Sequence, residues 1–155
     1  MVVRIEMNRL KDLREEKDLN QKDIAAIIKK SREAYKDYET GRLSMNINTL
    51  CTLCDYYKVS ADYMLCYTDQ RKTHPLTNRV KQHRLKDIRL EHNLTQSDIS
   101  NIINIVQNNY SKYELYKRKV PINVLLILAK YYDTSIDYLL CRTNNPKPYK
   151  KSILN

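Results

Sequence analysis

The sequence predicts an all-α protein made of two tandem five-helix domains joined by a basic linker. The first observation is an internal repeat: residues 9–69 align without a gap with residues 84–144, and about 27 of roughly 61 aligned positions are identical, which indicates two copies of one module. The second is that apolar residues in each copy recur at the three- and four-residue spacing of helices with one buried face. A chain of 155 residues has room for two such small domains.

The first two helices of the first copy follow from apolar spacing and a capping residue. Leu10 and Leu13 follow Met7 at i+3 spacing, which predicts one helix with an apolar stripe. Asn20 is a suitable N-cap for a second helix, because its side chain can accept a hydrogen bond from the exposed backbone N–H groups of a first turn. The apolar residues of this second helix are Ile24, Ala25, Ile27 and Ile28.

The remaining helices of the first copy are assigned in the same way. Ser31 caps a third helix that ends near Gly41, a natural C-terminal stop, and Ser60 caps a short fifth helix. Helical spacing predicts a fourth helix with Ile47, Leu50, Cys51 and Cys54 on one face. The second copy keeps this scheme. Tyrosines take the place of the absent Phe and Trp, and the recurring pairs Tyr35/Tyr110 and Tyr56/Tyr131 are predicted to be core residues.

Composition excludes several functions. A single glycine rules out glycine-rich phosphate loops and dinucleotide fingerprints. No apolar run approaches the roughly 20 residues of a membrane span, and the first ten residues lack the apolar stretch of a secretory signal. We therefore expect a cytoplasmic protein with reduced cysteines, no membrane association and no cofactor. The net charge of +10 and pI of about 9.4 favour an anionic partner such as nucleic acid.

The four cysteines are interpreted as structural. Cys51 and Cys54 form a C-x-x-C pattern, but they align with Leu126 and Ala129 of the second copy, which are apolar. No second pair completes a four-ligand set, so no metal site is predicted. The three histidines also lack the spacing of a metal or nucleophile site, and we expect no enzymatic activity.

Charge is spread unevenly over the predicted parts of the chain. We divide it into a first domain at residues 1–69, a linker at 70–83, a second domain at 84–144 and a basic tail at 145–155. Residues 9–69 hold eleven Lys/Arg and eleven Asp/Glu, whereas residues 84–144 hold nine and six. The linker adds four cations and the tail three, without acidic residues. Affinity for an anionic partner such as nucleic acid is thus expected to depend most on the second copy, the linker and the tail.

Three stretches of the first copy read "LNQKDIAAI", "SREAYKDYETGR" and "DYYKVSADYML", and their counterparts in the second read "LTQSDISNI", "VQNNYSKYE" and "KYYDTSIDYLL". In these stretches both copies resemble the Cro/cI-type (XRE-like) helix-turn-helix regulators of bacteria and phages. The resemblance implies two lambda-repressor-like domains. It also implies that the third helix of each enters the major groove, and that Ala25 and Ser100 are the small residues that let helices two and three cross closely.

The resemblance also assigns residues that contact DNA, and their chemistry suits the assignment. Arg pairs with guanine, Asn and Gln with adenine, and Glu with cytosine. Cations around these helices would supply a sequence-independent grip on phosphate. The expected base-reading residues are Arg32, Glu33, Lys36, Asp37, Gln107, Asn108, Ser111 and Lys112. The expected phosphate-binding residues are Gln21, Lys29, Lys30, Ser31, Arg42, Gln96, Lys117, Arg118 and Lys119.

Some positions depart from the family pattern. In the turn between helices two and three, where the backbone becomes left-handed, Asn104 is typical but Lys29 is sterically costlier. Val106 replaces the N-cap serine of the third helix in the second copy, and Tyr116 replaces the glycine that ends it. These differences predict that the third helix begins and ends differently in the two copies.

We expect double-stranded DNA as the partner and a transcriptional regulator, most simply a repressor, that reads two half-sites. Two alternatives stay open. One is an antitoxin-type regulator that also binds a partner protein. The other is a protein-interaction or homodimerisation module with vestigial DNA faces. The absence of net charge on the first copy supports this second alternative.

Overall fold

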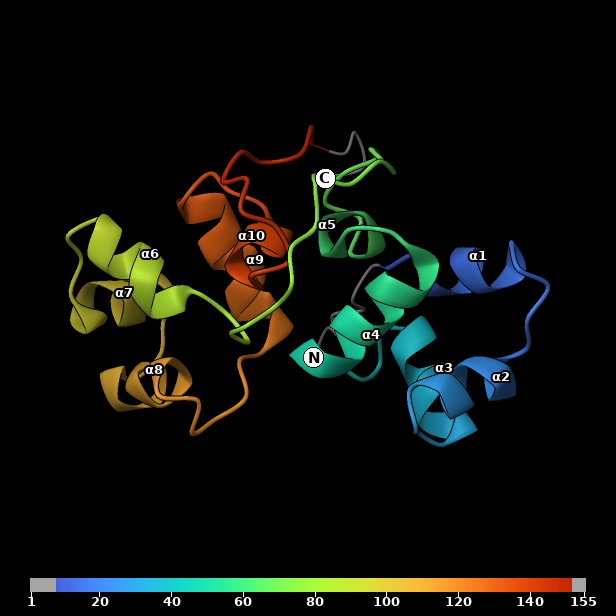
Figure 1. Ribbon diagram of the computed structural model, residues 1–155. Helices are drawn as coiled ribbons and strands as arrows, with labels where there is room; N and C mark the ends of the chain where they lie inside the picture. The colour runs from blue at the N-terminus through green and yellow to red at the C-terminus, as the bar shows by residue number, and fades with distance from the viewer. Residues whose placement is uncertain (1–7, 152–155) are drawn as a thin grey trace. The chain divides into compact units, whose positions relative to one another are not determined.

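The computed structural model describes residues 8–151, and in this range the chain forms ten α-helices in two compact units. Unit 1 comprises residues 8–73 and 149–151, and unit 2 comprises residues 74–148. Figure 1 shows the all-helical architecture. The predicted class of two tandem helical domains is confirmed. Met7, assigned to the apolar stripe of the first helix, lies outside the described residues.

Unit 1 begins its helices at polar caps. Asn20 and Asp23 form a reciprocal capping box, in which each side chain accepts a hydrogen bond from the backbone N–H of the other. Ser31 and Ser60 each accept a hydrogen bond from the backbone N–H three residues later, as predicted. The helices are α1 (Leu10–Glu15), α2 (Gln21–Ile27), α3 (Arg32–Glu39), α4 (Ile47–Tyr57) and α5 (Ala61–Met64).

Unit 2 repeats this order with two weaker helix starts. Thr95 forms a capping box with Asp98, and Ser135 caps the last helix. Val106 and Pro121, by contrast, occupy N-cap positions without a side-chain hydrogen bond. The helices are α6 (Leu85–Glu91), α7 (Gln96–Ile102), α8 (Gln107–Glu114), α9 (Ile122–Tyr131) and α10 (Ile136–Leu139).

The core of each unit is lined by the predicted apolar faces together with tyrosines. Tyr35 and Tyr110 are fully buried, as expected. The prediction for Tyr56 and Tyr131 is wrong, since their side chains are 36% and 48% exposed. The adjacent tyrosines, at positions 57 and 132, are buried instead, because they follow the core residues of α4 and α9 at i+3 and i+7 spacing and so lie on the inner face.

The cysteines pack as apolar residues. Cys51 and Cys54 lie on the buried face of α4, and the thiol Sγ of Cys54 is 3.9 Å from the Sδ atom of Met64. All four cysteines of the chain are reduced and buried. The prediction that the C-x-x-C pattern occupies apolar helix positions is confirmed.

The boundaries between the units differ from those predicted. Of the predicted linker, residues 74–83 pack within unit 2. The backbone N–H of Thr77 donates to the carbonyl oxygen of Arg142 at 2.9 Å, and Arg79 Nε donates to the carbonyl oxygen of Leu140 at 2.8 Å. Residues 149–151 of the predicted tail pack within unit 1. The basic segments are therefore parts of the folded units rather than free connections.

Candidate nucleic-acid interface

In both units, two short helices are joined by the same tight turn. Lys29 and Asn104 both have φ of 55°, the left-handed conformation that the sequence predicts there. One residue later, the backbone N–H of Lys30 donates to the carbonyl oxygen of Ala25, and that of Ile105 donates to Ser100, each at 2.9 Å. Lysine thus adopts the same geometry in unit 1 as asparagine in unit 2.

Small side chains allow the two helices to pack closely. Ala25 and Ser100 are each 3% exposed at the predicted crossing. The hydroxyl Oγ of Ser100 donates to the carbonyl oxygen of Ser97 at 2.8 Å, so its polarity is satisfied inside its own helix. This packing holds the third helix of each unit at a fixed angle to the second.

A hydrogen-bonded carboxylate ties the helices of unit 1 together. Arg14 Nε on α1 donates to Glu39 Oε1 on α3 at 2.5 Å, and Gln21 Nε2 on α2 donates to Glu39 Oε2 at 3.0 Å. Burial by itself raises the pKa of Glu39, but the hydrogen bonds from Arg14 and Gln21 outweigh it and hold this pKa below its usual value. The carboxylate is thus charged at neutral pH and links three helices.

Unit 2 contains the same network. Arg89 Nε donates to Glu114 Oε1 at 2.6 Å, and Gln96 Nε2 donates to Glu114 Oε2 at 2.9 Å. Sequence reasoning missed this arginine–glutamate pair in both units. A signal was present, because both members of the pair and the glutamine that joins them are identical in the two copies.

This network determines how the two expected phosphate-binding glutamines lie. Gln21 and Gln96 are half-buried at the first positions of α2 and α7. In each glutamine, one N–H of the side-chain amide donates to the carboxylate, and the same nitrogen carries a second N–H. The network therefore holds each glutamine at the start of its helix.

The expected base-reading residues share one face of each third helix. Arg32, Glu33 and Lys36 of α3 are exposed and Asp37 is half-buried. The same helix buries its tyrosines on the opposite side. On α8 the corresponding residues Gln107, Asn108 and Lys112 are exposed and Ser111 is half-buried. Positions i, i+1, i+4 and i+5 lie side by side on a helix, so each set forms one polar surface.

Cations surround these surfaces. Ser31 and all six Lys and Arg residues among the other expected phosphate contacts are exposed: Lys29, Lys30, Arg42, Lys117, Arg118 and Lys119. Arg118 Nη1 donates to Asn109 Oδ1 on α8 at 2.9 Å. This hydrogen bond draws one cation of the basic run against α8, and it adds Asn109 to the residues near the reading face.

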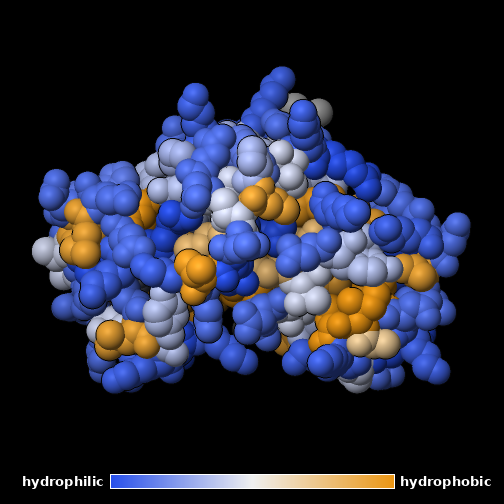
Figure 2. All heavy atoms as spheres, viewed as in Figure 1, coloured by the Kyte–Doolittle hydropathy of each residue, from blue (hydrophilic) through white to orange (hydrophobic). Residues whose placement is uncertain are grey.

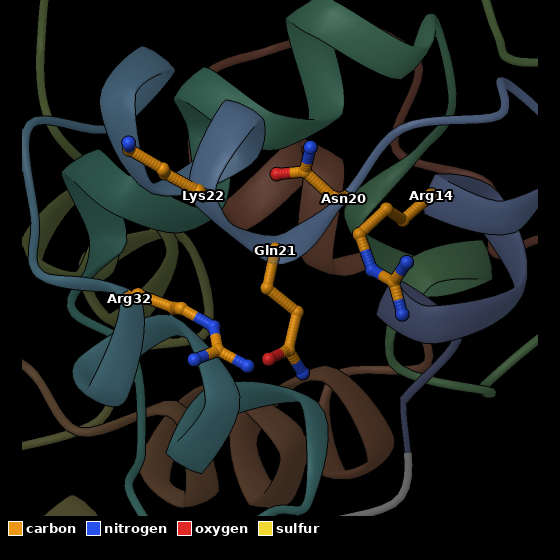
Figure 3. Close-up of a pocket in the computed structure, with 5 residues that line it drawn as sticks. All are labelled: Arg14, Asn20, Gln21, Lys22 and Arg32. Carbon is orange, nitrogen blue, oxygen red and sulfur yellow. The ribbon is translucent and has the colours of Figure 1, made fainter.

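A hollow of about 510 Å³ lies between the starts of α2 and α3. Figure 3 shows the side chains of Gln21 and Arg32 pointing toward one another, with Arg14 on the other side of the glutamine. Asn20 and Lys22 complete its lining. Lys22 was not among the residues expected from the sequence. The cationic side chains on its walls suit contact with the phosphates of a nucleic-acid backbone.

The residues that flank α8 differ from those that flank α3, but the backbone conformation is the same: Ser31 and Val106 are both extended, and Gly41 and Tyr116 are both left-handed. Val106 is 68% exposed at the N-cap and makes no capping hydrogen bond. Tyr116 adopts a φ of 56° where unit 1 has Gly41. Its ring lies 4.7 Å from that of His83, measured between centroids, and its hydroxyl donates to the carbonyl oxygen of His83 at 3.2 Å. These contacts offset the cost of a left-handed tyrosine.

The visible surface is mostly hydrophilic. Figure 2 shows a hydrophobic patch where α2 and α3 lie, and the exposed apolar residues of that region include Ile27 and Leu43. Across residues 8–151, no helix is both long and apolar enough to cross a membrane.

Comparisons with known proteins agree with this geometry. The helix-turn-helix family matches the chain twice, at residues 10–64 and 85–139. A Bacillus subtilis protein named as the uncharacterized HTH-type transcriptional regulator YobD is 40% identical over 65 residues, which cover 42% of this chain and 58% of that protein. The HTH-type transcriptional regulator ImmR of the same organism is 36% identical over 72 residues, covering 46% and 57%.

A third protein of that organism, the uncharacterized HTH-type transcriptional regulator YqaE, is 32% identical over 74 residues, or 46% of this chain and 64% of its own length. The chain thus spans about three-fifths of the length of the curated relatives it matches. No solved structure gives a significant match. The two family matches cover more than half of the chain, which therefore belongs to the helix-turn-helix family, in its Cro/cI-type (XRE-like) form, and carries the domain twice.

Proposed function

We propose that the protein is a sequence-specific double-stranded DNA-binding transcriptional repressor of the cytoplasm, without enzymatic activity, that reads two half-sites through α3 and α8. The observation that carries this proposal is the exposed polar face of each third helix. Gln107 and Asn108 are weak helix formers and are exposed at the start of α8, where surface stability alone would favour other residues. They are also the residue types that pair with adenine in the major groove.

The surrounding charge supports the same function. The basic run at residues 117–119 lies two residues beyond the end of α8 and is exposed. In unit 1, Lys22 and Arg32 line the hollow at the helix starts. Contacts of this kind to phosphate fix the register of a protein on the duplex, while the face of the third helix selects the sequence. Binding should therefore weaken steeply as salt rises.

The experiment separates base reading from phosphate contact. Asn108→Ala should cost roughly 1–3 kcal/mol on the preferred duplex and relax the choice at one base pair. Gln96→Ala should weaken binding to all duplexes about equally. Asn123→Ala, at an exposed position of α9, is the matched control and should change neither the affinity nor the choice of base pair. Binding curves on matched and mismatched duplexes measure these effects, and an unchanged specificity ratio for Asn108→Ala would rule out the assigned reading role.

A second candidate function concerns unit 1. Its repeat has no net charge, and Glu33 and Asp37 place two carboxylates on the face of α3. These features favour a surface that binds a partner protein or a second copy, as in an antitoxin-type regulator. The triple variant Arg32→Ala, Glu33→Ala, Lys36→Ala discriminates the two functions. Unchanged DNA affinity and specificity would favour protein binding, whereas a relaxed preference in one half-site would favour DNA reading.

A further inference from the structure

Arg118, which follows α8, is tied to that helix through both its backbone and its side chain. The backbone N–H groups of Lys117 and Arg118 both donate to the carbonyl oxygen of Lys112, at 2.9 Å and 3.2 Å. The side chain of Arg118 then reaches back along the helix, and its Nη1 atom donates to Asn109 Oδ1 at 2.9 Å. Because Asn109 lies three residues before Lys112, the side chain runs about 4.5 Å toward the amino-terminal end of α8.

This hydrogen bond places a guanidinium at the edge of the reading face, the polar surface formed by the four expected base-reading residues of α8. Asn109 directly follows Asn108, and Lys112 is its neighbour one turn later. Asn109 is half-buried, so it lies between the reading face and the buried side of the helix. In helix-turn-helix complexes the amino-terminal residues of this helix contact base edges. Arg118 is thus brought to the half of α8 in which bases would be read.

The guanidinium of Arg118 has donors for a base as well as for Asn109. It carries five N–H groups in one plane, and a bidentate pair with O6 and N7 of guanine takes two of them. The hydrogen bond to Asn109 takes one and restricts the rotation of the plane. A bidentate pair requires such an oriented fork, whereas the flexible point charge of a lysine is sufficient for phosphate.

Unit 1 has the same backbone at this place but different side chains. The positions equivalent to Asn109 and Arg118 are Ala34 and Leu43. The backbone N–H of Leu43 donates to the carbonyl oxygen of Asp37 at 3.2 Å, the same length as the equivalent bond of Arg118. The side chain of Leu43 is 45% exposed. Both units therefore present this position to solvent in the same way, and the difference in chemistry comes from two residues.

We propose that Arg118 is a specificity-determining residue of unit 2 that reads a guanine through its guanidinium, and that Asn109 is its positioning residue. This proposal rests on the function proposed above and goes beyond it, because it moves Arg118 from the phosphate contacts to the base-reading residues. The half-site of unit 2 then contains a guanine at the edge of the stretch that α8 contacts. The half-site of unit 1 has no matching preference at the equivalent base pair.

The experiment keeps the positive charge and changes the geometry of the donors. Arg118→Lys cannot form the bidentate pair, so it should reduce the preference for guanine at one base pair by roughly 5- to 100-fold. Asn109→Ala, which installs the residue of unit 1, should reduce the preference at the same base pair by a smaller factor, because the guanidinium remains but loses its orientation. Lys119→Ala, in the same basic run, is the matched control. It should weaken binding to all duplexes about equally and lower the salt dependence by about one phosphate contact.

Binding curves of the full chain on its preferred duplex, and on duplexes with each single base-pair change, measure these preferences at two salt concentrations. Helical circular dichroism checks that every variant is folded. If the parent selects a sequence but Arg118→Lys weakens all duplexes equally, or Asn109→Ala leaves every base preference unchanged, this inference fails while the proposed function stands. A parent without any sequence preference would contradict the proposed function itself and this inference with it.

Discussion

At the scale of single residues, the two copies use different side chains to accept the same hydrogen bond from the backbone of their first helix. Asn8 Oδ1 accepts a hydrogen bond from the backbone N–H of Leu10 at 3.0 Å in unit 1. At the equivalent position of unit 2, His83 Nδ1 accepts from the N–H of Leu85 at 3.4 Å. His83 is 3% exposed, and burial lowers its pKa below the usual 6.5. Only the second copy therefore carries a buried titratable group at this place.

This difference predicts a pH dependence that belongs to unit 2. Because the folded pKa of His83 is lowered, the unfolded chain binds more protons just below pH 6.5, and acid favours unfolding there. The stability that depends on a neutral His83 is fully present above pH 6.5 and is lost as the pH falls below this value. His83→Asn, which installs the residue of unit 1, should remove this loss. Urea unfolding at several pH values between 7.5 and 5 measures the free energy of unfolding, and circular dichroism follows it because the chain lacks Trp. If this free energy falls equally with pH in the parent and in the variant, His83 is not the group responsible.

Residue identity also determined which site features could be predicted. The exposed reading residues follow from the repeat and the motif, because a surface position on a short helix depends only on local periodicity. The glutamate network does not, since Arg14 and Glu39 are 25 positions apart and nothing in their local sequence shows that they meet. For Tyr56, recurrence in both copies suggested the core, but only the helical phase distinguishes it from its neighbour Tyr57.

At the scale of helices, the caps and turns were predictable because they depend on a few neighbouring residues. Asn20, Ser31 and Ser60 cap the helices they were assigned to. The packing of residues 74–77 and 149–151 was not predictable. These segments have no periodicity, and the hydroxyls that bind their carbonyl oxygens are distant in sequence: Thr68 is 82 positions from Lys150, and Thr143 is 68 from Pro75. A sequence pattern carries no information about such distant pairing.

The absent cap of α8 gives a prediction at this scale. Val106→Ser should stabilise unit 2 by about 1 kcal/mol, because a serine hydroxyl would accept a hydrogen bond from the first turn, as Ser31 does from the N–H of Ala34 in α3. The reciprocal variant Ser31→Val should destabilise unit 1 by a similar amount. Thermal unfolding of both variants measures the effect. A neutral result for Ser31→Val would show that capping does not control these helices.

At the scale of the whole molecule, the fold redistributes the charge that the sequence places in its linker and tail. Residues 149–151 bring Lys150 and Lys151 to unit 1, whose repeat is otherwise neutral, and residues 74–83 bring Arg79 and Lys81 to unit 2. Unit 1 thus gains positive charge from outside its neutral repeat, and unit 2, whose repeat is already cationic, becomes more so, which favours an anionic partner. The sum of charge was evident in the sequence, but its assignment to units needed the structure.

The last prediction concerns the two readers together. Because α3 presents Arg32, Glu33, Lys36 and Asp37 whereas α8 presents Gln107, Asn108, Ser111 and Lys112, the two half-sites should differ in sequence and the preferred operator should not be a palindrome. Replacing the four residues of α3 with those of α8 should make the half-sites alike, since side chains on this face select the bases. The network around Glu39, which the replacement leaves untouched, should keep α3 in place. Selection of bound duplexes from a random pool, for the parent and for the variant, measures both preferences. If the parent already selects two like half-sites, or if the replacement leaves the selected sequence unchanged, α3 does not read DNA and unit 1 has another partner.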